Sequence, residues 1–428
     1  MKRLDLFLWL LLWMVLGQAS AQDTLKMMQY NLMYYTNNSG VSDCNAVTNS
    51  LDSKDENLRT IFHYVKPDVF CVCELGSNNT YADRLLNNVI NTNGVSGYAH
   101  GPLTNYSGGT IANMIFYDTH KLSLYKHYYV TTSYRDINGY KMYYNSTGLA
   151  QGDTVFITFW IMHLKAGSSD ANAQSRHLQT QKLMNKLVSI GSPGNNVVSG
   201  DFNVYSASEP AYQELVDYSN SLYRFYDPID RPGNWNNNAA FADIHTQSTH
   251  STNYDNECFS SGGLDDRFDI ILVSPYVFYG SDRMHVLPET YHALGQDGHH
   301  YNNSINSPQN QAVPQDVANA LFNQSDHLPV ITEFLIDAQV GVTQYHRDFM
   351  LKVANPVRDN LTVFMQNEEP DQYRFEIYSI DGRLLDVFEE SLDADAHTLN
   401  HAFSYPKGIY LLKVSNSKGQ NQVVKLVR

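Results

Sequence analysis

Residues 196–203 have the sequence Asn-Val-Val-Ser-Gly-Asp-Phe-Asn, in which a short apolar run passes directly into a glycine and two polar residues. The paired valines favour a buried strand, and the glycine marks where that strand ends. Asp201 and Asn203 therefore stand two residues apart at a strand end. Residues of these types form turns, but they also bind metal ions and phosphates. Their role depends on what the rest of the chain places beside them.

Runs of apolar, β-forming residues recur on both sides of this stretch, separated by Gly, Asn, Asp or Pro. Residues 171–190 instead have apolar positions at helical spacing. Strands with a few helices between them, and without a regular strand–helix period, predict an α+β domain with mostly antiparallel pairing. The expected strands are Leu25–Asn31, Val69–Cys73, Met114–Tyr117, Val155–Ile161, Asn196–Ser199, Arg267–Val273 and Leu328–Ile336.

Three long segments, 36–53, 231–265 and 291–325, are interpreted as loops at the rim of an active site. From about residue 344 the composition changes. Short alternating runs, separated by Asp381-Gly382 and Lys407-Gly408, predict a small all-β module over residues 350–428.

The first 21 residues have the pattern of a secretory signal peptide. Lys2 and Arg3 precede the apolar run Leu6–Leu16, and the small residues Ala19-Ser20-Ala21 follow. We therefore expect a signal peptide over 1–21, a main domain over 22–340 and a C-terminal module over 341–428. No later run is long enough to span a membrane, so we expect no integral membrane segment in the mature protein.

Export also affects how the four cysteines are interpreted, because an exported protein can form disulfides. Cys44, Cys71, Cys73 and Cys258 allow three full connectivities, and the sequence does not choose among them. The protein is acidic, with a net charge of −15. Residues 22–344 contain 17 Lys and Arg against 31 Asp and Glu, a net charge of −14. This negative charge argues against tight binding to a long polyanion. It is compatible with an acidic cluster around a divalent cation, because the ion supplies positive charge locally.

Polar motifs lie at or beside the ends of the expected strands. Together they supply carboxylates, amides and imidazoles, which suit Mg²⁺, Mn²⁺ or Ca²⁺ better than zinc. Such a set can hydrolyse a phosphate ester, because a metal ion neutralises phosphoryl charge while a carboxylate activates water. The motifs are Gln29-Tyr30-Asn31, Cys73-Glu74-Leu75, Met162-His163-Leu164-Lys165-Ala166, Gly200-Asp201-Phe202-Asn203, Asp266-Arg267-Phe268-Asp269 and Ser325-Asp326-His327.

In this order the motifs resemble those of the endonuclease/exonuclease/phosphatase superfamily, which includes DNase I-like nucleases and neutral sphingomyelinases. The resemblance covers about residues 25–337, and Gly200–Asn203 and Ser325–His327 are its most specific parts. It implies a DNase I-like four-layer fold, in which a sandwich of two sheets is flanked by helices and the site lies at the strand ends on one edge.

The resemblance also implies roles for single residues. Glu74 would be the main metal ligand, with Asn31 beside it and Asp326 as a metal-side acid. His163 and Asn203 would contact phosphate, Asp201 would activate the attacking water, and Asp269 would orient the catalytic His327. Asn113 would line the site, and we expect the nearby cations to be Lys165, Arg176 and Arg267.

The C-terminal module resembles the type A sorting domain of the type IX secretion system. The resemblance rests on Asn355-Pro356-Val357, on the segments 377–383 and 408–414, and on the end of the chain, 423–428. It implies export by the type IX secretion machinery to the medium or the outer-membrane surface, with removal of the module.

The sequence therefore predicts a secreted, Mg²⁺-dependent phosphodiesterase with endonuclease-like activity, for which Mn²⁺ or Ca²⁺ could replace Mg²⁺. A lipid phosphodiesterase of sphingomyelinase type is the alternative enzyme, and its substrate would be a phospholipid headgroup. A non-catalytic surface-binding protein is the alternative from another class. The natural substrate, the number of metal ions and the oligomeric state stay open.

Overall fold

The computed structural model describes residues 22–37, 39–146, 149, 154–191, 193–252, 258–337, 349–353, 356–357, 359–367 and 369–428. The expected signal peptide, 1–21, lies outside these residues, as does the junction near residue 344. The division into domains at residues 22, 340 and 341 therefore stays a prediction. Within the described residues, no helix combines the length and the apolar character needed to cross a membrane.

The first sheet of the main domain has six strands in the order β10-β11-β1-β2-β4-β3. The central strands β1 and β2 are parallel, and the other neighbours in this sheet pair antiparallel. Its strands are β1 (Gln22–Tyr35), β2 (Val69–Gly76), β3 (Tyr98–His100), β4 (Ile111–Asp118), β10 (Met284–Ala293) and β11 (Val330–Asp337).

The second sheet has five strands in the order β5-β6-β7-β8-β9. Here β7 and β8 are parallel, and the other pairs are antiparallel. Its strands are β5 (Leu122–Val130), β6 (Ile137–Tyr144), β7 (Phe156–His163), β8 (Asn196–Asp201) and β9 (Asp269–Val273).

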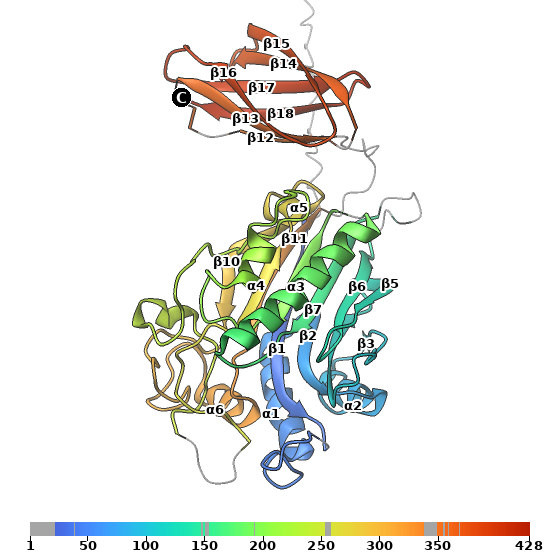
Figure 1. Cartoon of the computed structure of the whole chain (residues 1–428), viewed down its shortest axis with the longest axis vertical. Helices are drawn as coiled ribbons and strands as arrows, with labels where there is room; N and C mark the ends of the chain where they lie inside the picture. Colours follow the sequence, from blue (N-terminus) through green and yellow to red (C-terminus); the bar gives the residue numbers. More distant parts are fainter. Residues whose placement is uncertain are drawn as a thin grey trace, which may run out of the picture.

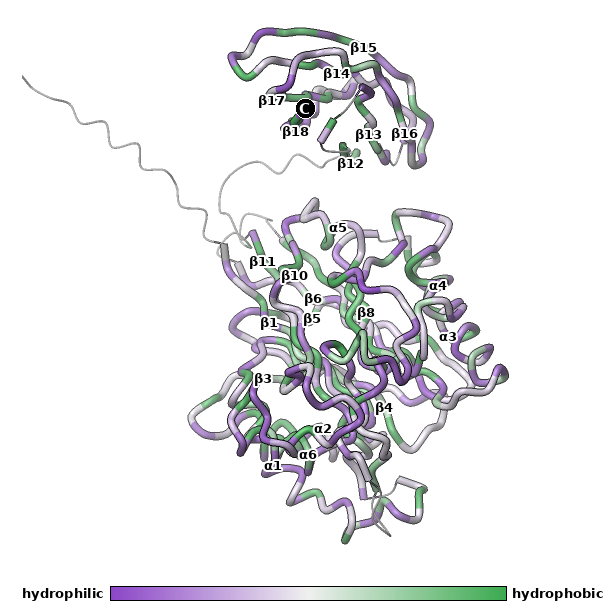
Figure 2. Tube along the Cα trace, turned by 90° about the vertical axis from the view of Figure 1, so that its left-hand side faces the viewer, coloured by the Kyte–Doolittle hydropathy of each residue, from purple (hydrophilic) through white to green (hydrophobic). Residues whose placement is uncertain are grey.

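The two sheets face each other, and helices cover their outer faces (Figure 1). Because side chains alternate along a strand, β7 has Phe159 and Ile161 in the core between the sheets, whereas Trp160 and Met162 face the helices α3 and α4. Hydrophobic residues run along β8, while α3 is largely hydrophilic (Figure 2). The helices over the first sheet are α1 (Leu51–Val65), α2 (Asn79–Leu85) and α6 (Gln315–Gln324); those over the second are α3 (Asp170–Ile190) and α4 (Pro210–Val216).

The C-terminal module consists of two antiparallel sheets with their own core, which includes Phe375, Leu412 and Val414. One sheet has the order β12-β13-β16 and the other β15-β14-β17-β18. The strands are β12 (Phe349–Val353), β13 (Asn360–Asn367), β14 (Asp371–Ser379), β15 (Leu384–Leu392), β16 (Ala396–Ala402), β17 (Ile409–Asn416) and β18 (Asn421–Val427). The predicted fold class, an α+β two-sheet sandwich with helices and a small all-β module, is confirmed.

Several elements were not expected from the sequence. The sequence-based prediction lacks two kinds of element. The missing strands are the hairpin β5–β6, β3 and β10. The missing helices are α1, α6, α5 (Pro275–Phe278), the π-helical turn Leu86–Ile90 and the 3₁₀ helix Ala239–Ile244. The expected loop 291–325 is therefore interrupted by α6.

A disulfide joins Cys44 to Cys258, whereas Cys71 and Cys73 are free and buried. It links the long segments 36–53 and 231–265.

Candidate active site

Three of the predicted site residues form one row across the second sheet. His163 ends β7 and pairs in register with Asp201, which ends β8. Asp201 in turn pairs with Asp269, the first residue of β9. On a strand, side chains two or four residues apart lie on the same face. The core between the sheets contains Ile161, Val197 and Ile271, which stand at these spacings, so His163, Asp201 and Asp269 all face the first sheet. The sheet register thus brings together residues separated by more than one hundred positions in the chain.

Gly200 makes this close arrangement possible. Its φ is +148°, and a Cβ atom at this position would lie 1.7 Å from the backbone oxygen of Met162 on the neighbouring strand. Any larger residue would therefore separate β7 from β8 beside His163 and Asp201. The glycine in the Gly-Asp-Phe-Asn motif has a structural reason, which is the close approach of two strands.

The first sheet contributes Asn31 and Glu74 from its two parallel central strands. The register between β1 and β2 shifts between Asn31 and Tyr35, and Glu74 adopts a left-handed conformation with φ 60°. Irregularities of this kind redirect side chains and are frequent beside active sites. The backbone N–H of Tyr34 donates to Glu74 Oε2 at 2.9 Å. The bulge thus turns the Glu74 carboxylate into the space between the sheets.

Asn31 connects the two sheets across this space. Its amide Nδ2 donates to Glu74 Oε1 at 3.1 Å and to Asp201 Oδ2 at 3.0 Å, and it lies 3.4 Å from His327 Nε2. Its Oδ1 accepts from the backbone N–H of Met33 at 2.9 Å. Asn31 therefore fixes the separation of two acidic groups that would otherwise repel each other.

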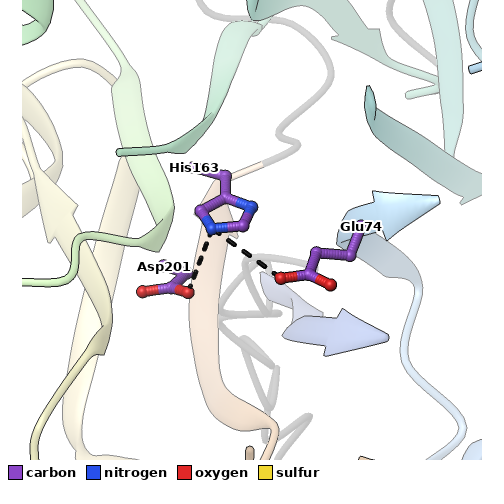
Figure 3. Close-up of side chains that lie close together, drawn as sticks. All are labelled: Glu74, His163 and Asp201. Carbon is purple, nitrogen blue, oxygen red and sulfur yellow. Dashed lines mark ion pairs between the residues drawn. The ribbon is translucent and has the colours of Figure 1, made fainter. Parts of the chain in front are cut away.

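Glu74, His163 and Asp201 can provide a metal site. One potential ligand atom from each residue lies within 4.8 Å of the other two (Figure 3). His163 Nε2 is 3.8 Å from Glu74 Oε1 and 3.4 Å from Asp201 Oδ2. Burial and the nearby Asp326 raise the pKa of Glu74 above its usual value. Burial, opposed by the charge of His327 and assisted by the charges of Asp269 and Glu74, raises the pKa of Asp201 to about 7.

These raised pKa values have a physical meaning for the site. Several carboxylates crowd into a space from which water is largely excluded, so each disfavours the charge of the others. A divalent cation between them would relieve this repulsion and return both groups to the charged form. The donor set of two carboxylates and one imidazole fits such an ion.

His327 forms a buried pair with Asp269. His327 Nδ1 lies 2.7 Å from Asp269 Oδ2, and both side chains are buried. Burial lowers the pKa of His327, but the carboxylates of Asp269, Asp201 and Asp326 together raise it well above its usual value. Asp269 thus holds the ring in the orientation in which Nδ1 bears a hydrogen and Nε2 faces Asp201, 3.7 Å away.

Asp326 lies next to this pair but does not belong to the three-residue cluster. Its Oδ2 accepts from the side chain of Gln247 at 3.1 Å and from the backbone N–H of Ser260 at 3.1 Å. Its Oδ1 is buried and has no hydrogen-bond partner among the described residues. Gln247 Nε2 also lies 2.7 Å from His327 Nε2. Sequence reasoning missed Gln247, which stands in a long loop without a motif around it.

The cations near the site differ from those expected. Arg135 Nε and Nη2 donate to the backbone oxygens of His163 and Leu164, at 3.3 and 3.2 Å. Burial lowers the pKa of His163 well below its usual value, and the charges of Arg135, His327 and Lys165 lower it further. His163 is therefore neutral at physiological pH, and its Nδ1 has no partner among the described residues. Arg135 was not expected from the sequence.

Two of the expected cations serve the scaffold instead. Arg176 is buried, pairs with Glu209 at 2.7 Å and donates to backbone oxygens. Arg267 is also buried and pairs with Asp227 at 2.7 Å. Their guanidinium groups are already neutralised by carboxylates, so we do not expect them to contact a phosphate. Of the three predicted cations, only Lys165 remains available.

Two asparagines make mainly backbone contacts. Asn203 has φ 52°, and its side chain donates to the backbone oxygen of Leu164 at 3.3 Å, while its N–H donates to Asp201 Oδ1 at 3.0 Å. It therefore fixes the turn after β8 and orients Asp201. Asn113 donates to the backbone oxygens of Asp136 at 2.9 Å and Ile161 at 3.3 Å. These bonds tie β4 to the second sheet.

A comparison with protein families agrees with one part of this description. The family model of the secretion system C-terminal sorting domain matches residues 354–428, which confirms the resemblance of the C-terminal module. No curated protein sequence is significantly similar to the chain.

Several solved structures are similar to the chain, and these likenesses concern the fold. The human Nocturnin catalytic domain is 14% identical with a TM-score of 0.44, and the match covers 73% of this chain and 97% of that one. An endonuclease/exonuclease/phosphatase from Bacteroides vulgatus is 14% identical with a TM-score of 0.46, covering 73% and 99%. Another from Beutenbergia cavernae is 12% identical with a TM-score of 0.42, covering 94% and 100%.

Proposed function

We propose that this protein is a secreted, divalent-metal-dependent phosphodiesterase with endonuclease-like activity. The observation that supports this most strongly is the convergence of Glu74, His163 and Asp201 within 4.8 Å, beside the buried His327–Asp269 pair. A metal-binding cluster and an oriented imidazole can both promote hydrolysis of a phosphodiester, because each stabilises negative charge on the phosphoryl group. The chain brings them together from both sheets of the sandwich.

The cluster would hold a Mg²⁺ ion, with Mn²⁺ or Ca²⁺ as substitutes. Glu74 is the proposed main ligand, and Asn31 sets its position. Asp326 supplies a buried oxygen, Oδ1, that has no hydrogen-bond partner among the described residues. A bound ion would neutralise negative charge on the phosphoryl oxygens. The neutral state of His163 suits it either as a further ligand or as a contact to phosphate.

Asp201 and His327 are the proposed groups that handle protons and charge. Asp201, which the ion would keep in its charged form, can accept a proton from an attacking water. His327, held by Asp269, can stabilise negative charge on phosphate through Nε2. Asn203 keeps Asp201 in place through its backbone N–H and is the proposed second contact to phosphate.

The matched sorting domain supports export by the type IX secretion machinery, with release or attachment at the outer-membrane surface. The disulfide between Cys44 and Cys258 agrees with an oxidising environment.

A substrate panel tests the proposal. Purified protein is assayed with Mg²⁺ on double-stranded DNA, RNA, sphingomyelin vesicles and bis-p-nitrophenyl phosphate, beside the variant Asp201→Asn. We expect cleavage of nucleic acid and of the small diester by the wild type, and a loss of about 10²-fold or more in the variant. Asp265→Asn is the matched control, because the pKa of this half-buried acid is raised by burial alone. Turnover of sphingomyelin without nucleic acid cleavage would assign the protein to the lipid branch, and no turnover at all would refute an enzymatic role.

A further inference from the structure

Two exposed tyrosines stand side by side near the proposed site. Tyr106, in the loop before β4, is 67% exposed, and Tyr129, near the end of β5, is 43% exposed. Their ring centroids lie 4.6 Å apart. We call this pair the tyrosine platform. Large aromatic side chains that remain in water next to each other serve the core poorly, but they offer a stacking surface to a planar ligand.

The platform is tied rigidly to the turn that leads to the site. Asp136 is buried and accepts from the backbone N–H groups of Tyr106 and Ser107, at 2.8 and 2.9 Å. The Ser107 hydroxyl also contacts Asp136 and accepts from the N–H of Thr132 at 3.0 Å. Four hydrogen bonds thus join the loop that carries Tyr106 to the turn 131–136. These bonds fix the backbone of the Tyr106 loop relative to the turn.

The same turn reaches the backbone of the active site. Arg135, the neighbour of Asp136, donates to the backbone oxygens of His163 and Leu164. The ring of Tyr134 lies 5.6 Å from Lys165 Nζ. The turn beside the His163 backbone therefore carries Arg135 and has Lys165 over the ring of Tyr134, and the loop bonded to this turn carries one ring of the aromatic pair. Single-stranded nucleic acid offers bases that stack on aromatic rings and phosphates that attract cations, so it suits this combination of groups.

We propose that the tyrosine platform binds an unpaired base of single-stranded nucleic acid whose scissile phosphate lies in the candidate active site. This inference rests on the proposed phosphodiesterase function and adds its substrate class. The net charge of −14 over residues 22–344 favours a single strand over a duplex, because stacking needs few cations whereas a duplex is held mainly through its phosphates. Arg135 and Lys165 supply a local positive charge for one or two phosphates.

Binding of a labelled oligothymidylate of about 12 nucleotides tests the inference without relying on turnover. Affinity is measured by fluorescence anisotropy with Mg²⁺ in an Asp201→Asn background. Replacing both platform tyrosines, Tyr106→Ala with Tyr129→Ala, should weaken binding at least about fivefold. The corresponding double change to Phe should retain the affinity, because the rings remain.

Tyr125→Ala is the matched control. Tyr125 is 60% exposed on the same strand, but it packs against Phe156 at the opposite end of β7 from His163. We expect unchanged affinity for this variant. The proposed role of the platform would be refuted if the double alanine variant bound the oligonucleotide as tightly as its parent, or if neither protein bound it. The platform would also be refuted if the double alanine variant lost binding to sphingomyelin vesicles but bound the oligonucleotide as its parent does. The proposed function fails separately, if the wild type does not hydrolyse bis-p-nitrophenyl phosphate.

Discussion

The pair of Asp269 and His327 provides a sharp prediction about catalysis. Asp269→Asn removes a charge-assisted hydrogen bond of 2.7 Å between two buried groups. Such a bond contributes about 1.5–3 kcal/mol. If it acts in the transition state, its loss slows hydrolysis by roughly 10- to 150-fold. An Asn amide that donates to Nδ1 would also force the hydrogen onto Nε2, so we expect a loss of about 10²-fold or more.

A double-mutant cycle on kcat/KM for bis-p-nitrophenyl phosphate measures this coupling. His327→Ala should abolish most of the rate, and adding Asp269→Asn should cause no further loss, because Asp269 acts only through the ring. Asp266→Asn is the matched control: Asp266 lies three residues away, and its carboxylate accepts from Asn236 at 2.9 Å. Losses that multiply in the double variant would show that the two residues act independently and would refute the pairing.

Three further predictions concern stability, processing and salt. Burial between Phe259 and Phe322 lowers the pKa of His250 to about 4. The imidazole therefore stays neutral in the folded protein down to about pH 4, whereas in the unfolded chain it is protonated below about pH 6.5. The stability contributed by the neutral ring is therefore lost as the pH falls from about 6.5 to about 4. In urea unfolding, the free energy of unfolding of His250→Phe relative to the wild type should rise by up to about 3 kcal/mol between pH 7 and pH 4. A difference that stays constant with pH would contradict this. Mass spectrometry of the secreted protein should show a start near Gln22 and loss of most residues after about 344, whereas residues 350–428 still attached to extracellular protein would indicate a binding module. The KM for DNA should depend on salt with a slope equivalent to only about two to four phosphate contacts, and a steep slope would reveal a basic groove.

Much of the sandwich and of the site could be predicted from the sequence. His163, Asp201 and Asp269 stand at the ends of strands whose apolar runs are recognisable, and an ordinary sheet register aligns them. The hairpin β5–β6 was missed because polar residues interrupt the apolar pattern of both strands. Lys126 does so in the partly exposed edge strand β5, and Lys141 does so in β6, which is mostly buried. Sheet edges of this kind carry a weak signal.

The residues missed at the site share a physical reason. Gln247 and Arg135 stand in loops, and only the packing of distant segments brings them to His327 and His163. The pairing of Cys44 with Cys258 spans 214 residues and depends on the same packing. Conversely, the charge of Arg267 was visible in the sequence, but its buried partner Asp227 was not. Sequence patterns locate strand ends, whereas the neutralisation of a charge depends on the tertiary structure.

The rate of bis-p-nitrophenyl phosphate hydrolysis as a function of free Mg²⁺ concentration tests the proposed metal site most directly. We expect no activity in EDTA, a rise that saturates with Mg²⁺, and a shift of the midpoint to higher Mg²⁺ concentration in Glu74→Gln, at least about tenfold. The melting temperature of this variant in EDTA should stay close to that of the wild type, because the change removes charge from a crowded acidic cluster. Full activity in EDTA, or an unchanged midpoint in Glu74→Gln, would contradict a catalytic metal ion at this cluster.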